Sequence, residues 1–221
     1  MITPRRTDKS DFKVPHMETF LRGCREFEEH EKRDAMYKVA SFLMQYSWKK
    51  DIPMMADGLG VLLLTWNQAF YRYGLPDFQR LEDCIRSNLP KLEVYRRRSI
   101  LSFSQTDHDE IISLFREFLD ALQIAEGNSK GKKSPVAVGK ALHLLAPDFF
   151  PAWDTEIQRG YHCYYNQDPA ERYVRFCAIV RNIASELEAA ERVKDCMSRT
   201  GKTLVKLIDE FNYSKYTQKW I

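Results

Sequence analysis

The sequence predicts an all-α fold, because its apolar residues recur at helical spacing and no stretch reads convincingly as a strand. Across the 221 residues, apolar positions repeat every three or four residues, which is the spacing of one helix face. Polar motifs that start helices, and Gly or Pro residues that stop them, divide these repeats. We expect about eight to ten helices, with boundaries defined to about three residues.

The composition is typical of a folded domain. Apolar residues make up 44% of the chain and aromatic residues 13%, which is enough to build a core. The net charge of +3 permits a nucleic-acid partner without favouring one. The most apolar run, Val61 to Leu64, is far too short to cross a bilayer, so no membrane partner is expected.

The two ends and the cysteines bear on organisation and compartment. Residues 1–15 are polar and charged, so we predict a disordered arm, no signal peptide and a cytoplasmic location. A single helical domain is expected over 16–221, with two lobes if a cleft forms near 134–159. The five cysteines are widely spread and form no C-x-x-C pair, which indicates free thiols and neither a metal site nor another cofactor. The sequence does not define the oligomeric state.

The first half of the chain is predicted to contain several helical segments. They are 17–27, 36–46, 55–73, 78–89 and 91–103. The first two follow each other so closely that they form either two helices or one bent helix. Gly74 and Pro76 end the third segment, which is the most apolar. Pro90 is expected to separate the last two, because proline interrupts a helix interior.

Start motifs define the helices of the second half. A capping box with Asp in the first place is predicted at Asp107 to Glu110. Ser134-Pro135 and Asp168-Pro169 have the residues typical of the N-cap and first helical positions. Residues 127–134 form a flexible basic loop between helices. A last helix is expected over 204–211.

The segment from Ser134 to Arg159 combines an abrupt break with a candidate reactive carboxylate. A helix over 135–146 is followed by Pro147 and Pro151, and Asp154 then starts a second helix. Backbone N–H groups at a helix start hold a carboxylate rigidly and stabilise its charge. Such a carboxylate suits a reaction in which positive charge develops on a sugar, as in glycosidic bond cleavage.

A structural role for Asp154 competes with this chemistry. Asp is a preferred N-cap residue, and Asp154 stands where a cap is needed, although the pattern Thr155-x-x-Gln158 offers Thr155 as an alternative cap. Spacing alone favours a cap over a catalyst. Lys140 and His143 are expected together on the helix face opposite the buried stripe. They form either a proton-transfer pair or a lysine beside a surface or satisfied histidine.

Taken in order, short motifs of this chain resemble the helix-hairpin-helix DNA glycosylases, the group of endonuclease III and the adenine DNA glycosylases. Residues 150–154 look like the family's entry into its catalytic aspartate, and 154–159 is similar to the pattern Asp-Thr-His-Val-x-Arg. Residues 63–68 resemble an apolar helix that ends in a Gln or Asn that probes the duplex. The run 95–100 resembles the basic segment before the hairpin. The resemblance covers residues 58–160, in the family's order.

The chain also departs from the family pattern. The hairpin sequence Leu-Pro-Gly-Val-Gly is missing, and residues 130–135 stand in its place. Val136 aligns with the position at which bifunctional members carry a Schiff-base lysine, so the resemblance implies a monofunctional enzyme. Lys140 matches that lysine only in a shifted register, and Lys133 is a weaker substitute. The family's iron–sulfur cysteine set is missing as well.

The resemblance implies two helical lobes that bind double-stranded DNA and flip a damaged or mispaired base into a pocket. The implied catalytic residues are Asp154, Lys140 and Lys133. The implied DNA-binding residues are Asn67, Gln68, Arg96, Arg97, Lys130, Gly131, Lys132 and Arg159. The implied base-pocket residues are Trp66, Tyr71 and Tyr73. A plainer reading stands beside each group, with the aromatic residues as core and the basic residues as a solvated face and loop.

Three functions stay open at this point. The order of the motifs favours a DNA glycosylase. A catalytically inert helical DNA-binding module and a protein-interaction domain without a nucleic-acid role are the alternatives, and the small net charge allows the last of these. A basic strip beside Asp154 would favour the first two functions, and a buried, fully capped Asp154 would count against the first.

Overall fold

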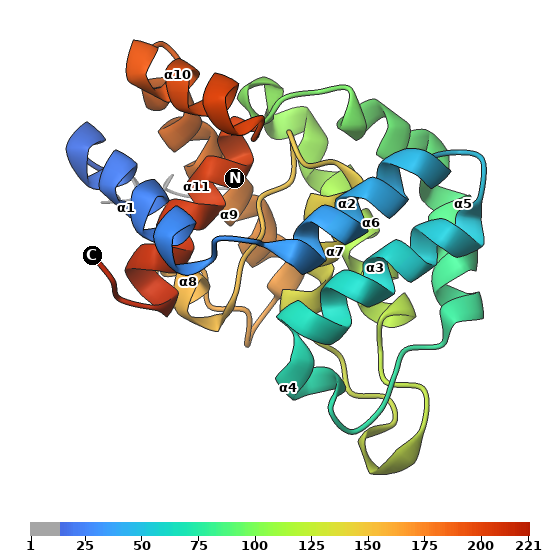
Figure 1. The fold of residues 1–221 in the computed structure, drawn as a ribbon. Helices are drawn as coiled ribbons and strands as arrows, with labels where there is room; N and C mark the ends of the chain where they lie inside the picture. Colours follow the sequence, from blue (N-terminus) through green and yellow to red (C-terminus); the bar gives the residue numbers. More distant parts are fainter. Residues whose placement is uncertain (1–13) are drawn as a thin grey trace, which may run out of the picture.

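A computed structural model describes residues 14–221, and this part of the chain is helical (Figure 1). Its α-helices are α1 (Met17–His30), α2 (Ala35–Ser47), α3 (Ile52–Trp66), α4 (Gln68–Tyr71), α5 (Phe78–Arg96), α6 (His108–Ala121), α7 (Pro135–Leu145), α8 (Thr155–Gly160), α9 (Pro169–Leu187), α10 (Glu191–Thr200) and α11 (Leu204–Asn212). A π-helix over Tyr213–Thr217 follows α11. Within 14–221, extended pairing is confined to one isolated bridge between Pro76 and Ile124, which confirms the all-α prediction. Of the disordered arm predicted over residues 1–15, residues 1–13 lie outside the described part of the chain.

The helices form two groups, with α9 between them (Figure 1). In one group, α2 packs on α3, and α3 packs on α5 and α7. In the other, α1 and α10 pack on α11, close to the point where the chain ends in the figure. Helix α9 contacts α6, α7 and α11, so it ties the two groups into one core. None of the described helices is long and apolar enough to cross a membrane.

Two predicted helix starts are confirmed by their capping hydrogen bonds. The Ser134 hydroxyl accepts from the Ala137 N–H at 3.2 Å, at the start of α7. The Asp168 carboxylate accepts from the Glu171 N–H at 3.3 Å, at the start of α9. In both helices Pro follows the cap, where its missing N–H has no helical partner to lose.

The capping box predicted at Asp107 is wrong. The Asp107 carboxylate does not bond the first turn of α6 but turns back along the chain. It accepts from the Ser104 N–H at 2.8 Å and pairs with Arg98 at 2.6 Å. A 3₁₀ turn over Gln105–Asp107 precedes α6, so the box belongs to Ser104 and Asp107, three residues earlier than predicted.

Pro90 does not end a helix, contrary to the prediction, because α5 runs through it. Pro90 and Arg86, whose carbonyl loses its helical partner, are both exposed, so the missing hydrogen bond faces water. Ile85 and Leu92 are fully buried and anchor the helix on either side of the proline. Tertiary packing thus outweighs the tendency of proline to interrupt a helix. The helix predicted over 91–103 is not a separate element, because its residues belong to the end of α5 and to a 3₁₀ turn over Ile100–Ser102.

The most apolar helix is shifted from its predicted range of 55–73. Asp51 caps α3 by accepting from the Met54 N–H at 3.0 Å, and α3 ends at Trp66. Asn67 interrupts the helix, and its side chain donates to the Ser134 hydroxyl at 3.0 Å. This bond ties the end of α3 to the start of α7. Helix α10 was not predicted, because most of its residues are polar and it buries only Val193 and Cys196.

Candidate functional site

A pocket lies between the two groups of helices, beside the segment that joins α7 to α8. Its volume is about 260 Å³, slightly below the roughly 300–1,000 Å³ of typical ligand sites. The polar and aromatic residues of its wall that matter for chemistry are Asp154, Lys140, Trp66, Asp34, Asp209 and Tyr213. The chain thus brings together, from α3, α7 and the start of α8, three residues that the sequence assigned to one site.

Asp154 is the N-cap of α8 and a residue of the pocket wall at the same time. Its Oδ1 accepts from the N–H groups of Glu156 and Ile157, both at 2.8 Å. Its Oδ2 accepts from the Thr217 hydroxyl at 2.6 Å. Thr155 does not act as the cap, because its hydroxyl contacts Tyr165 instead. The cap and catalyst interpretations therefore do not exclude each other, since the half-buried carboxylate still faces the pocket.

Lys140 reaches the same pocket from the middle of α7. Its ammonium donates to the Trp66 carbonyl at the end of α3. Burial lowers the pKa of Lys140, and the carboxylates of Asp154 and Asp209 offset this effect only in part. A lowered pKa increases the fraction of free amine, which is the nucleophilic form of a lysine.

His143 does not pair with Lys140 and does not lie on an exposed face, because α7 is buried on nearly every side. Its ring is fully buried between the Tyr37 hydroxyl, 3.2 Å from Nε2, and the Phe150 carbonyl, 2.8 Å from Nδ1. Burial lowers the pKa of His143 and favours the neutral ring. Tyr37 stacks on His143 and also on Trp66, so this histidine supports the pocket wall from behind.

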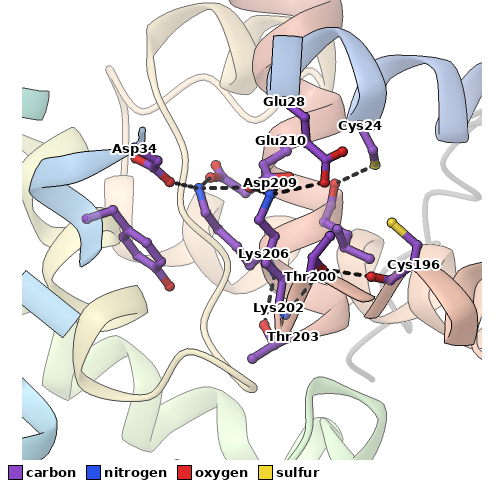
Figure 2. A network of polar contacts seen from close by, with 12 residues as sticks. Cys24, Glu28, Asp34, Cys196, Thr200, Lys202, Thr203, Lys206, Asp209 and Glu210 are labelled. Atoms are coloured by element: carbon purple, nitrogen blue, oxygen red, sulfur yellow. Dashed lines mark hydrogen bonds and ion pairs between the residues drawn. The ribbon is translucent and has the colours of Figure 1, made fainter. Parts of the chain in front are cut away.

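A buried ionic cluster is centred on Lys206 (Figure 2), and it adjoins the pocket because two of its members, Asp34 and Asp209, line the pocket wall. Lys206 Nζ lies 3.5 Å from Asp34 Oδ2 and 3.2 Å from Asp209 Oδ2. It is also 3.7 Å from Glu210 Oε1, and Lys202 Nζ lies 2.9 Å from that same oxygen. Burial acts to lower the pKa of Lys206, but the surrounding carboxylates outweigh it and raise the pKa above its usual value. Lys206 therefore carries a permanent positive charge.

This cluster determines which acids of the pocket are free. Asp34 and Asp209 line the pocket, and both form an ion pair with the same lysine, Lys206, behind the pocket wall. Asp154 and Glu31 line it too, and neither forms an ion pair within residues 14–221. The wall thus keeps an excess of negative charge, with Lys140 as the opposing group.

Sequence reasoning did not single out the Lys206 cluster. The signal in the sequence is the i, i+3, i+4 spacing of Lys206, Asp209 and Glu210. This spacing places opposite charges on one face of a helix. Nothing local marks that face as buried, because the partner Asp34 comes from the turn before α2. Three aromatic rings complete the enclosure at 4.6–4.9 Å from Lys206 Nζ, and they belong to Phe27, Tyr37 and Trp66.

The lysines of the loop before α7 lie outside the pocket wall. Lys133 is exposed and pairs with Asp120 at the end of α6, so the structure does not place it beside Asp154. Lys130 and Lys132 are exposed on either side of Gly131, which has a φ of 80°. The Gly131 N–H donates to the Ile124 carbonyl at 2.8 Å, so the loop is an ordered turn. These lysines stay candidates for phosphate contacts.

The other predicted pocket and probe residues divide between core and surface. Tyr71 is buried and donates to the Leu122 carbonyl at 2.9 Å, which is a structural role. Tyr73 is 67% exposed and lines a separate hollow together with Lys130. Gln68 is exposed at the start of α4, directly after Asn67. Of the aromatic residues predicted to stack on a base, Trp66 is the one that lines the pocket at Asp154.

The arginines predicted to contact DNA have partners within the protein. Arg96 donates to the Leu145 carbonyl at 2.7 Å and lies 4.1 Å from the centre of the Trp48 ring, so it holds α5 in place. Arg97 and Arg159 pair with glutamates one turn earlier in the chain, at 2.5 and 2.6 Å. Their side chains are 74% and 58% exposed, so such pairs are easily exchanged.

Comparison with protein-family models, curated proteins and solved structures returns no match to this chain. The resemblance to helix-hairpin-helix glycosylases therefore stays a prediction. In the described part of the chain, no three His, Cys, Asp or Glu side chains are arranged to hold a metal ion. The candidate chemistry is that of a carboxylate, an amine and an aromatic ring around one pocket.

Proposed function

We propose that the pocket at Asp154 is the active site of a DNA glycosylase, with a two-lobed fold like that of the helix-hairpin-helix glycosylases. The observation that carries the proposal is that Asp154, Lys140 and Trp66 line one pocket, although they come from three different helical segments. The order of these three residues in the sequence did not by itself require them to lie around one pocket. An enzyme that cleaves a glycosidic bond needs such a carboxylate beside space for a flat base.

In the proposed reaction, the flipped base enters the pocket and stacks on Trp66. The bond from C1′ of the sugar to the base breaks, and the base leaves with the bonding electron pair. Positive charge then develops on the sugar, and the Asp154 carboxylate stabilises it. Water adds to C1′ and gives up a proton, which completes hydrolysis. Alternatively, the free amine of Lys140 adds to C1′ and loses a proton. The bond from C1′ to the ring oxygen then breaks, the oxygen takes up a proton, and a protonated imine remains on the open-chain sugar.

The charge of the pocket supports a particular class of base. Asp154 and Glu31 form no ion pair within residues 14–221, and the rings of Phe27, Trp66 and Tyr213 line the same space. Aromatic faces and carboxylates both attract cations. We therefore favour a base that carries positive charge, such as an alkylated purine, over a neutral one.

Two exposed segments that adjoin elements of the pocket wall in sequence support a duplex partner. Gln68 and the lysines of the loop 127–134 belong to two segments that pack together, since the Ala125 N–H donates to the Leu75 carbonyl at 2.9 Å. The first segment follows Trp66, and the second precedes α7, which carries Lys140. Trp66 and Lys140 both line the pocket. Exposed cations and an exposed amide on these two segments are suited to phosphate and base contacts.

The test is base release from duplex oligonucleotides that carry a panel of lesions, including 7-methylguanine as a cationic base, and uracil, 8-oxoguanine and an adenine mismatch as neutral cases. We expect release by the parent, with the cationic base preferred, and loss of release in Asp154→Asn. Lys140→Gln is expected to abolish trapping of a covalent DNA adduct by borohydride if the amine is the nucleophile. Lys194→Gln, which changes an exposed lysine of α10, is the matched control.

The other outcomes separate the remaining hypotheses. DNA binding without base release, unchanged in Asp154→Asn, would overturn the enzyme and support the inert DNA-binding module. Neither binding nor release would overturn both nucleic-acid functions. In that case Asp154 is the N-cap of α8 alone, and a protein-interaction domain is the function that stays.

A further inference from the structure

The segment that follows α11 returns to the pocket and contacts the candidate catalytic acid. Its π-helix, Tyr213–Thr217, places the Thr217 hydroxyl 2.6 Å from Asp154 Oδ2. The two residues are 63 positions apart in the sequence. Tyr213, from the same π-helix, lines the pocket itself. This segment is thus part of the site.

The bond from Thr217 completes the orientation of the Asp154 carboxylate. Two backbone N–H groups of α8 hold Oδ1 at 2.8 Å, and they fix one oxygen only. A hydroxyl donor on Oδ2 fixes the second oxygen and so defines the plane of the group. An ionised carboxylate offers about four acceptor sites, so three donors leave about one site for a sugar cation or a water molecule.

Contacts along the segment hold Thr217 in place. The ring of Tyr216 lies against Gly160 in α8, where a Cβ atom would approach it to 2.5 Å. Ser214 donates to the Gly23 carbonyl in α1 at 2.8 Å. The ring of Trp220 stacks on His30 at 4.2 Å between ring centres. The hydroxyl therefore sits on a docked element and has little freedom to leave Asp154.

We propose that Thr217 is a positioning residue that orients the Asp154 carboxylate for catalysis, and that the segment 213–217 completes the active site. This inference rests on the glycosylase activity proposed above. Thr217 touches neither the base nor the sugar in this scheme; it acts through Asp154. Sequence reasoning had no access to it, because the motifs that indicated the site end at residue 160.

Thr217→Val tests the proposal, because valine keeps the shape of threonine and removes the hydroxyl. A hydrogen bond to a charged group is strong enough that its loss is expected to lower the single-turnover rate of base release about 10- to 100-fold. Thr217→Ser keeps the hydroxyl and is expected to restore most of the rate. The Kd for DNA should stay the same in both variants, since the bond acts on the carboxylate and not on the duplex. Ser185→Ala is the control, because it removes an exposed hydroxyl of α9 that contacts neither Asp154 nor the segment 213–217.

A spectroscopic measurement separates this inference from the proposed activity. The ¹³C chemical shift of the Asp154 carboxyl carbon should change in Thr217→Val and not in Ser185→Ala. No base release by the parent overturns the proposed function, and the catalytic role of Thr217 with it. Release by the parent at a rate that Thr217→Val leaves unchanged, or an unchanged carboxyl signal in that variant, overturns the positioning role and leaves the glycosylase standing.

Discussion

The indole ring of Trp153 lies directly on the backbone of Gly139. A Cβ atom at Gly139 would lie 2.5 Å from Cδ1 and 2.7 Å from Nε1 of that ring. The same indole N–H donates to the Pro135 carbonyl at 3.0 Å, so α7 fixes the ring at two points. Trp153 immediately precedes Asp154, and the position of the carboxylate therefore depends on the absence of a side chain at Gly139.

Gly139→Ala is expected to destabilise the protein, although alanine is the better helix former. The added methyl group forces the buried Trp153 ring to move, and overpacking of this kind costs about 1–3 kcal/mol. Urea denaturation measures the loss. Gly58→Ala in α3 is the matched control, since its Cβ would meet nothing closer than 3.4 Å. The control should be neutral or stabilising by up to about 1 kcal/mol. Equal stability of the two variants would contradict the close contact.

Lys206→Met is expected to lower the free energy of unfolding by about 3–5 kcal/mol, because removing one partner of a buried ionic group leaves the others uncompensated. The carboxylates left without a cation would be Asp34 and Asp209, whereas Glu210 would keep Lys202. Lys194→Met, on α10, is a control at an exposed lysine and should change stability by less than about 1 kcal/mol. Combining Lys206→Met with Asp209→Asn should recover part of the loss. A Lys206→Met protein as stable as the parent would mean that the cluster is not formed in solution.

Arg97 and Arg98 are neighbours in sequence with different expected contributions. Arg98 binds both oxygens of the largely buried Asp107 carboxylate, at 2.6 and 2.9 Å. Arg98→Ala should therefore cost about 2–3 kcal/mol, as the loss of a charged hydrogen-bond partner does. Arg97 is 74% exposed, and Arg97→Ala should cost less than about 1 kcal/mol. Thermal denaturation of the two variants side by side is the measurement, and similar shifts in Tm would contradict the structure.

What the sequence could predict was local. The caps at Ser134 and Asp168 need only neighbouring residues, and both are present. The break around Pro147 and the helix start at Asp154 were equally local, and so the candidate carboxylate was found. The helical spacing of apolar residues likewise predicted most helices, because the residues of one buried helix face recur every three or four positions.

What the sequence could not predict depends on distant partners. Pro90 lies inside a helix because buried residues on both sides of it anchor α5 to the rest of the core. Asp107 turns away from its own helix because Arg98 attracts it. Lys206 and Thr217 reach the site from the last fifth of the chain, and nothing near them in sequence marks that destination. The same holds for His143, whose burial follows from helices packed on every side of α7.

His143 gives the protein a pH-dependent stability whose sign follows from its environment. Burial is the main cause of its lowered pKa, and the charge of Lys206 acts in the same direction. Asp209, Asp34 and the Phe150 carbonyl act against it and are outweighed. The unfolded chain then binds a proton on this ring more readily than the folded protein does. Stability from the neutral ring is complete above the unfolded pKa of about 6.5 and is lost as the pH falls below it.

His143→Phe removes this titration and should flatten the pH dependence. At pH 8 the variant is expected to be less stable by about 1–3 kcal/mol, because the Tyr37 hydroxyl and the Phe150 carbonyl lose their partner. Between pH 6.5 and 5 the parent should lose stability relative to the variant, by at most about 1.4 kcal/mol per pH unit. Urea denaturation at several pH values measures the difference, with His162→Phe as a control at an exposed histidine. Parallel curves for parent and His143→Phe would show that the ring is not held neutral in the fold.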